Sequence, residues 1–99
     1  MKTLTIQIGN TDNRLTQQEW ADYVREISQF LQGTTSSVHF SGGSPAEAPW
    51  QNYCWVCGLE ELIWHLEHHD EVLLTTLSGI GKKYNQDSVA VTIGETQFV

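Results

Sequence analysis

Two cysteines and two histidines near the middle of the chain have the residue types of a zinc site. Cys54 and Cys57 form a C-x2-C pair, and His65 and His69 form an H-x3-H pair. Thiolate and imidazole are the ligands that tetrahedral zinc takes in structural sites. Two features argue against the site: only seven residues separate Cys57 from His65, where about twelve are usual, and a strand would point the two thiols to opposite faces. A buried cysteine pair with surface histidines is the favoured alternative, and zinc is the one cofactor that the sequence suggests.

Other chemistries of the same segment have weaker signals. His65 precedes His68 and His69 by three and four residues, so either pair could bind a metal ion from one helical face together with Glu61. However, the segment lacks the glutamate of the H-E-x-x-H hydrolase motif. A thioredoxin-like role for the Cys pair would require the first thiol at a helix start. The sequence contains no nucleophile elbow, P-loop or dinucleotide-binding glycine pattern. No catalytic residue is assigned, and a non-enzymatic role is favoured over an enzyme.

Carboxylates and tryptophans dominate the same region. Residues 60–71, called the acidic segment below, contain five of the twelve acids and no Lys or Arg. In protein interfaces aromatic side chains supply buried area, and charges steer association. The sequence therefore predicts a site for a protein partner with a basic surface, against the alternative of an ordinary solvated face. The predicted contact residues are Trp50, Glu60, Glu61, Trp64, Glu67, Asp70 and Glu71.

The length and the net charge of the chain limit the classes of function that it can have. The 99 residues suffice for one domain, 1–99, with a core of its own. Five Lys and Arg against twelve Asp and Glu give a net charge of -7, which disfavours direct binding to nucleic acid. The first ten residues have neither a signal-peptide core nor a membrane span. We expect a cytoplasmic protein with free thiols and no membrane partner.

The first half of the chain predicts a strand, a helix and a second strand. Apolar and polar residues alternate over 3–8, which predicts a strand with one buried face. Thr16 and Glu19 form a capping box for a helix over 17–32, with Gly33 at its C′ position. Residues 36–41 form a short strand, in which Val38 and Phe40 would share one face.

The second half predicts the same order of elements, a strand, a helix and a strand. Residues 51–57 are apolar on both faces, which is typical of a central strand. A helical pattern over 59–84 is too long for a compact domain, so we expect a break near 68–70 with Asp70 as N-cap. Residues 59–66 could instead extend the strand as a hairpin arm. Residues 89–93 alternate as a last strand, where Gly94 could introduce a bend or bulge.

The order β-α-β-β-α-β predicts an α+β protein of the ferredoxin-like plan. In that plan two helices cover one face of a four-stranded antiparallel sheet. The polar face of the sheet stays open and could bind a small molecule or form a homodimer, which is the competing function class. Trp50, Asn52, His39 and Gln7 would line such a small-molecule site.

Several short motifs carry a resemblance to a protein family. They are Ile8-Gly9-Asn10 with Asp12, Leu15-Thr16-Gln17 with Glu19-Trp20, Ala48-Pro49-Trp50-Gln51-Asn52, Tyr84 with Gln86-Asp87-Ser88, and Gly94-Glu95-Thr96. With these motifs the chain resembles an uncharacterised family of small acidic bacterial and phage proteins. The resemblance implies a shared fold and no mechanism. It also favours an inhibitor of a bacterial defence or nucleic-acid-binding protein among the interaction modules.

Overall fold

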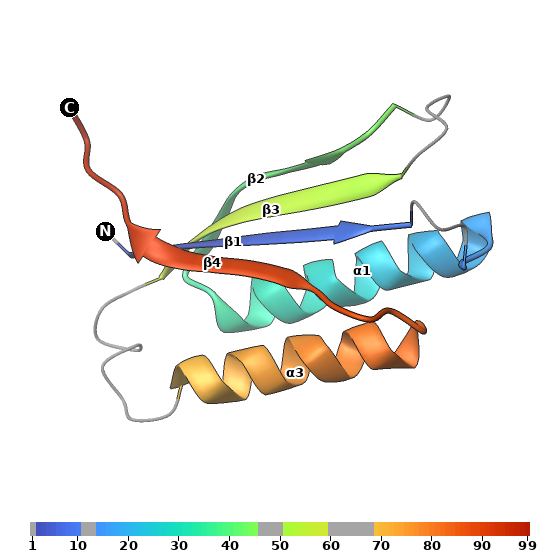
Figure 1. Cartoon of the computed structure of the whole chain (residues 1–99). Coiled ribbons are helices and arrows are strands. Elements are labelled where there is room, and N and C mark those ends of the chain that lie inside the picture. The colour runs from blue at the N-terminus through green and yellow to red at the C-terminus, as the bar shows by residue number, and fades with distance from the viewer. Residues whose placement is uncertain (1, 11–13, 46–50, 60–68) are drawn as a thin grey trace.

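The computed structural model describes residues 2–10, 14–45, 51–59 and 69–99, with the backbone alone for 69 and 70. Its elements are β1 (Lys2–Gly9), α1 (Gln17–Thr34), β2 (Ser37–Gly43), β3 (Asn52–Leu59), α3 (His69–Lys83) and β4 (Ala90–Glu95). The strands form one antiparallel sheet in the order β2-β3-β1-β4, and both helices lie on the same face of it (Figure 1). The α+β, ferredoxin-like prediction is confirmed.

The core lies between the sheet and the helices because the two central strands alternate with period two. Trp55 is the largest buried side chain among the described residues, and its indole N–H donates to Ser28 Oγ on α1 at 3.0 Å. That bond satisfies the polar end of a ring that otherwise contributes apolar area. The buried apolar residues are Leu4, Ile6 and Ile8 of β1, Leu15, Tyr23, Ile27 and Leu31 in and before α1, Trp55, Cys57 and Leu59 of β3, and Leu73 and Leu77 of α3.

The predicted start of α1 is confirmed, and its predicted end is wrong. The Glu19 N–H donates to Thr16 Oγ1 at 3.2 Å, and the Thr16 N–H donates to Glu19 Oε1 at 3.0 Å, which completes the capping box. Gly33 is not a C′ residue, because the helix continues to Thr34. The Thr35 N–H instead donates to the Leu31 carbonyl at 2.9 Å, so an extended threonine caps the helix without a left-handed glycine.

A β-bulge changes the faces of β2. Val38 pairs with Cys57, whereas Phe40 pairs with Val56, so His39 is the extra residue between them. Directly paired residues point to the same face. Val38 therefore faces the helices, and Phe40 lies on the open face with 58% of its surface exposed. The prediction that Val38 and Phe40 share a face is wrong, because alternation along one strand cannot reveal a bulge.

The second helix begins and ends slightly differently from the prediction. α3 begins at His69, so Asp70 lies in its first turn and not at the N-cap. Asn85 has φ 59°, the Asn85 N–H donates to the Lys82 carbonyl at 3.0 Å, and the Gln86 N–H donates to the Gly81 carbonyl at 2.9 Å. These bonds make a Schellman motif with asparagine in the left-handed position. β4 then pairs with β1 in regular register through Gly94, without the expected bulge.

The hydroxyl of Tyr23 gives a test of the core. It is buried and has no hydrogen-bond partner among the described residues, and burial raises the pKa of Tyr23 to about 12. Removing a buried hydroxyl without a partner removes a desolvation cost, so Tyr23→Phe should raise the free energy of unfolding by about 1 kcal/mol near neutral pH. Urea denaturation of the two proteins measures this difference.

The same substitution should change how the free energy of unfolding falls at alkaline pH. The unfolded tyrosine ionises near pH 10, below the folded pKa, so wild-type stability is fully present below about pH 10 and falls towards pH 12. Tyr23→Phe should make this loss shallower but not abolish it. The hydrogen bond to Glu26 also raises the pKa of Tyr84 to about 12, and Tyr84 remains in the variant. A variant that is less stable than wild type at neutral pH would show that the hydroxyl has a stabilising partner.

Candidate functional site

The acids of α1 are engaged in contacts within the molecule. Glu19 is engaged in the capping box, and Asp22 forms an ion pair with Arg25. Lys83 of α3 donates to both carboxylate oxygens of Glu26 at 3.0 and 3.1 Å. A hydrogen bond from Tyr84, and secondarily Lys83, lowers the pKa of Glu26. Glu19, Asp22 and Glu26 against Arg25 and Lys83 leave a net charge of -1 on this face, which offers little to steer a basic partner.

The acidic segment runs from the end of β3 into the first turn of α3. Leu59 of β3 pairs with Lys2, and Lys2 also pairs with Glu95, so the segment leaves the sheet at the end where β1 begins and β4 ends. Glu71 is exposed in the first turn of α3. Asp70 is in the same turn, with its side chain outside the described part. The other predicted contact residues lie outside the described residues: Trp50, Glu60, Glu61, Trp64 and Glu67.

The net charge of the chain is concentrated in this segment. Five acids and no base in residues 60–71 leave seven acids and five bases for all other residues, a balance of -2. All five bases belong to the described residues, and three of them form ion pairs: Arg14 with Asp87, Arg25 with Asp22, and Lys83 with Glu26. Five of the seven excess negative charges thus occupy twelve consecutive residues, from the end of β3 into the first turn of α3.

The two thiols of the predicted zinc set lie on opposite faces of β3. Cys57 pairs with Leu4 and is fully buried under the helices, whereas Cys54 pairs with Gln7 on the open face and is half-buried. The pair does not converge on one ion. Within the described residues no cluster of three metal-ligating side chains occurs. His65 and the side chain of His69 lie outside the described part, so their metal binding stays a prediction.

A buried asparagine organises the opposite end of the molecule. Asn10 is 1% exposed, and its side chain exchanges two hydrogen bonds with the backbone of Leu15 and donates to Gln51 Oε1 at 3.0 Å. The Asn10 N–H also donates to the Gln51 carbonyl, and Gln51 Nε2 donates to Gln17 Oε1 at 2.8 Å. This network joins the end of β1, the start of α1 and the start of β3. In the sequence, Asn10 stands out only as part of the Ile8-Gly9-Asn10 motif.

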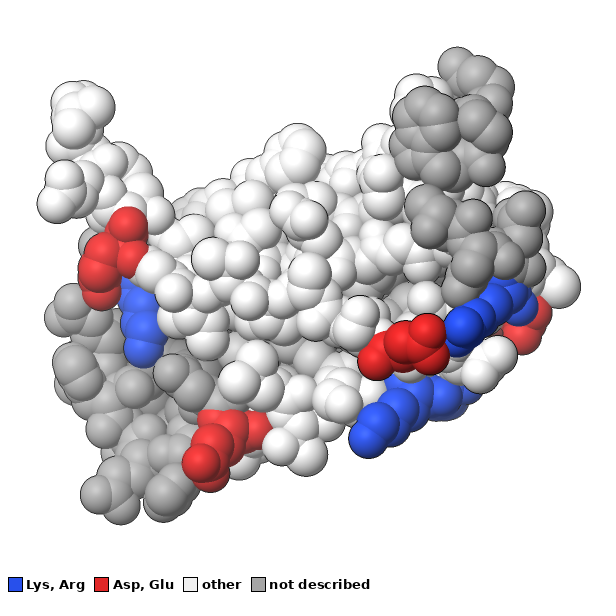
Figure 2. Space-filling view, viewed as in Figure 1, with Lys and Arg blue, Asp and Glu red and all other residues white. Residues whose placement is uncertain are grey.

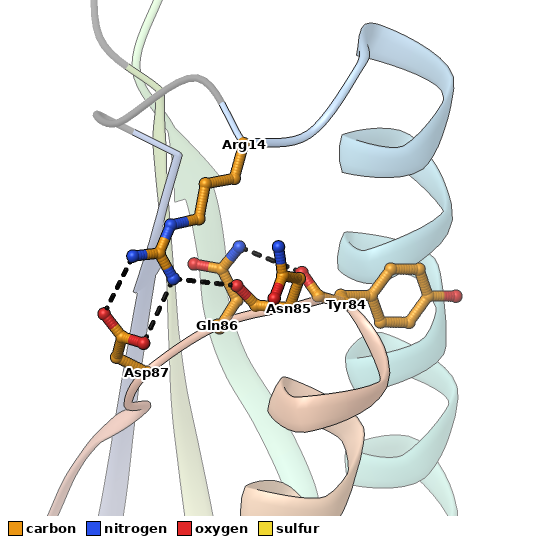
Figure 3. A network of polar contacts seen from close by, with 5 residues as sticks. All are labelled: Arg14, Tyr84, Asn85, Gln86 and Asp87. Carbon is orange, nitrogen blue, oxygen red and sulfur yellow. Dashed lines mark hydrogen bonds and ion pairs between the residues drawn. The ribbon is translucent and has the colours of Figure 1, made fainter.

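A second polar network lies at the same end (Figure 3). Arg14 donates to both carboxylate oxygens of Asp87 at 3.0 and 3.1 Å, and to the Asn85 carbonyl at 3.1 Å. A bidentate guanidinium pair fixes geometry as well as charge. It ties the segment before α1 to the turn after α3. The motif residues Asn10, Gln17, Gln51 and Asp87 therefore meet at one end of the fold because they join its elements.

A groove opens beside this network, between α1 and the β2–β3 hairpin, with a volume of about 460 Å³. Trp20 and Tyr53 supply aromatic surface, Gln17 and Gln51 supply amides, and Arg25 supplies a cation. The remaining lining residues are Ala21, Val24, Gly43, Ser44, Pro45 and Asn52. Aromatic walls with a few polar groups can hold a flat organic molecule or a peptide side chain. Most of these lining residues were not singled out from the sequence, since α1 and β3 are far apart along the chain.

The open face of the sheet has a smaller hollow of about 420 Å³ at the same end. Gln7 and Asn52 line it, together with Cys54, Ile8 and Tyr53. The structure thus brings together two of the four residues predicted for a small-molecule site. His39 is instead at the β2 bulge, and Trp50 lies outside the described residues.

Comparison with known proteins assigns no family to the chain. No protein-family model matches the chain, and a search of curated proteins finds no match. In the described residues, neither helix combines the length and apolar character needed to cross a membrane.

The placement of the thiols predicts their reactivity. Burial raises the pKa of Cys57, a hydrogen bond with Thr35 offsets this in part, and the side chain has no exposed surface. Cys54 is partly accessible from the open face. Because alkylation requires an accessible thiolate, iodoacetamide should label Cys54 at least about tenfold faster than Cys57 in the native protein. Peptide mass spectrometry measures both rates. The unfolded protein in urea is the control, where the two rates should converge; equal rates in the native protein would contradict the burial of Cys57.

Proposed function

We propose that this protein is a non-enzymatic interaction module that binds a basic protein surface through the acidic segment. The observation that carries the proposal is the segregation of charge: a nearly balanced body holds a segment with five acids and no base. A local field of one sign attracts a complementary partner over the distance that salt screening allows, about 8 to 10 Å. Trp64, within the segment, would supply apolar contact area once the partner is bound.

The fold supports this role by anchoring the segment at both ends. Leu59 is 2% exposed and paired with β1, and Leu73 is 1% exposed in the core one turn after the start of α3. Fixed ends reduce the conformational entropy that is lost on binding. The resemblance to small bacterial and phage proteins extends the proposal to inhibition of a bacterial defence or nucleic-acid-binding protein, in the cytoplasm. In this role the acids would meet a surface that otherwise binds phosphates.

A second candidate function rests on the groove beside Trp20 and Tyr53. Its volume falls within the usual range for small-molecule sites, about 300 to 1,000 Å³. Its amides and Arg25 could orient a polar ligand between the two aromatic rings. Native mass spectrometry of freshly purified protein tests this function, since a retained organic ligand would favour it over the acidic-segment proposal. Spectra recorded with and without a chelator also report any bound zinc.

Neutralising the acidic segment tests the first proposal. A partner recovered from a bacterial lysate should associate with the variant Glu60→Gln, Glu61→Gln, Glu67→Gln about tenfold more slowly than with wild type at low salt, because steering is lost. The dissociation rate should change little. Trp64→Ala should instead weaken the complex by about 2 kcal/mol, mainly through faster dissociation. Surface plasmon resonance measures both rates over a range of salt concentrations.

The matched control changes the net charge by the same amount elsewhere. Gln18→Lys, Gln29→Lys and Gln32→Lys add three positive charges at exposed positions of α1. This control should retain most of the wild-type association rate. Equal slowing in both variants would mean that net charge acts without a defined site. An association rate that depends neither on these substitutions nor on salt concentration would show that the acidic segment is not part of the interface.

A further inference from the structure

β4 is an edge strand that lacks the usual protection against strand pairing. It pairs with β1 on one side, and in the described sheet no strand lies on the other. The opposite edge, β2, is interrupted by the bulge at His39, whereas β4 pairs in regular register from Ala90 to Glu95. β4 contains no proline, and its one charged residue is the last. Free N–H and C=O groups along such an edge can pair with another strand.

The flank of α3 beside this edge is partly apolar. Leu74, Ser78 and Gly81 follow one another at helical spacing, so they share one side of α3. A Cβ at Gly81 would lie 3.0 Å from Val89 Cγ2, which places this side next to the start of β4. The ion pair of Lys83 with Glu26 places another side of α3 towards α1. Leu74, 43% exposed, therefore extends the edge surface with an apolar side chain.

Charges on this surface are arranged end to end. Glu71 and Glu95 lie where α3 begins and β4 ends, and Lys82 lies where α3 ends. Lys2 lies beside Glu95, with which it is paired in the sheet. Figure 2 shows charged side chains at the two ends of this face and an uncharged band between them. β4 and α3 run in opposite directions over similar lengths, as Figure 1 shows. Along α3 itself, Glu71 in the first turn and Lys82 in the last turn have opposite charges. A helix flank with opposite charges at its two ends is complementary to its own copy after a two-fold rotation.

We propose that the protein forms a two-fold symmetric homodimer by antiparallel pairing of β4 with β4 of a second copy. The two sheets would continue as one eight-stranded sheet. Strands about 4.8 Å apart and helices about 10 Å apart would bring the α3 helices of both copies into side-by-side contact. Leu74 of each copy would lie in that contact, and Glu71 of one copy would lie near Lys82 of the other.

The arrangement also separates the excess negative charge. In each subunit the acidic segment continues into α3, so it joins the described part at the start of that helix. An antiparallel dimer places the two starts of α3 at opposite ends, which limits the repulsion between two chains of net charge -7. A strand from an unrelated protein would complete the edge equally well, but it would have no reason to match both charged ends. This self-complementarity favours a second copy.

Analytical ultracentrifugation over a wide concentration range tests the dimer and its site. Wild type should show a reversible monomer–dimer equilibrium. Leu74→Lys should raise the dimer Kd at least about tenfold, because two lysines would enter an apolar contact. Val72→Lys is the matched control. Val72 is 62% exposed on the same helix but two residues from the edge stripe, so its substitution should change the Kd less than about twofold.

A charge-swap experiment tests the dimer independently if Leu74→Lys impairs folding. Glu71→Lys and Lys82→Glu should each raise the Kd severalfold, and the double variant should recover most of the wild-type value. Thr5→Lys probes the centre of the open sheet face, where Thr5 pairs with Val56 and Thr92. A monomer at every concentration overturns the proposal. So does a dimer that is weakened by Thr5→Lys alone, or one that no variant weakens.

Discussion

Burial of one face of β1 and β3 under the two helices is the constraint on which the rest of this structure depends. Leu4 and Ile6 of β1 and Trp55 of β3 are at most 1% exposed, and they lie opposite the apolar stripes of α1 and α3. Because strand residues alternate, the same two strands must present their other residues to the open face. The position of Cys54 outside the core and of Cys57 within it follows directly from this alternation.

The two ends of the sheet differ in their polar interactions. At one end, Asn10 and the Arg14–Asp87 pair join four chain segments through hydrogen bonds. A buried amide of this kind is stable only when its partners are in place, so it fixes the approach of α1 and β3 to the end of β1. At the other end β3 ends and α3 begins, the two elements that flank residues 60–68 in the chain. The fold thus separates these polar networks from the two points where the acidic segment joins the described part.

Charge segregation links the two proposed interactions. Among the described residues, at least three of the five bases form ion pairs with nearby acids. Most of the excess negative charge of the sequence therefore belongs to the acidic segment. Antiparallel association through β4 would present two such fields at opposite ends of one assembly. Two binding sites on one rigid body can engage a repeated or dimeric partner with higher effective concentration than a single site. The edge strand and the acidic segment would then serve one function.

The sequence by itself determined the elements, the fold class and the location of the excess charge. Alternation in residues 3–8, the Thr16–Glu19 capping box and the apolar spacing of α3 are local signals, and local signals are sufficient to specify period and start points. Tertiary structure alone decided the bulge at His39, the buried role of Asn10, and the groove between Trp20 and Tyr53. Each of these depends on residues far apart in the chain that meet only after the strands pair, and no local pattern encodes that pairing. The left-handed Asn85 lies between these cases, since asparagine permits the conformation but the packing of α3 determines where the helix must end.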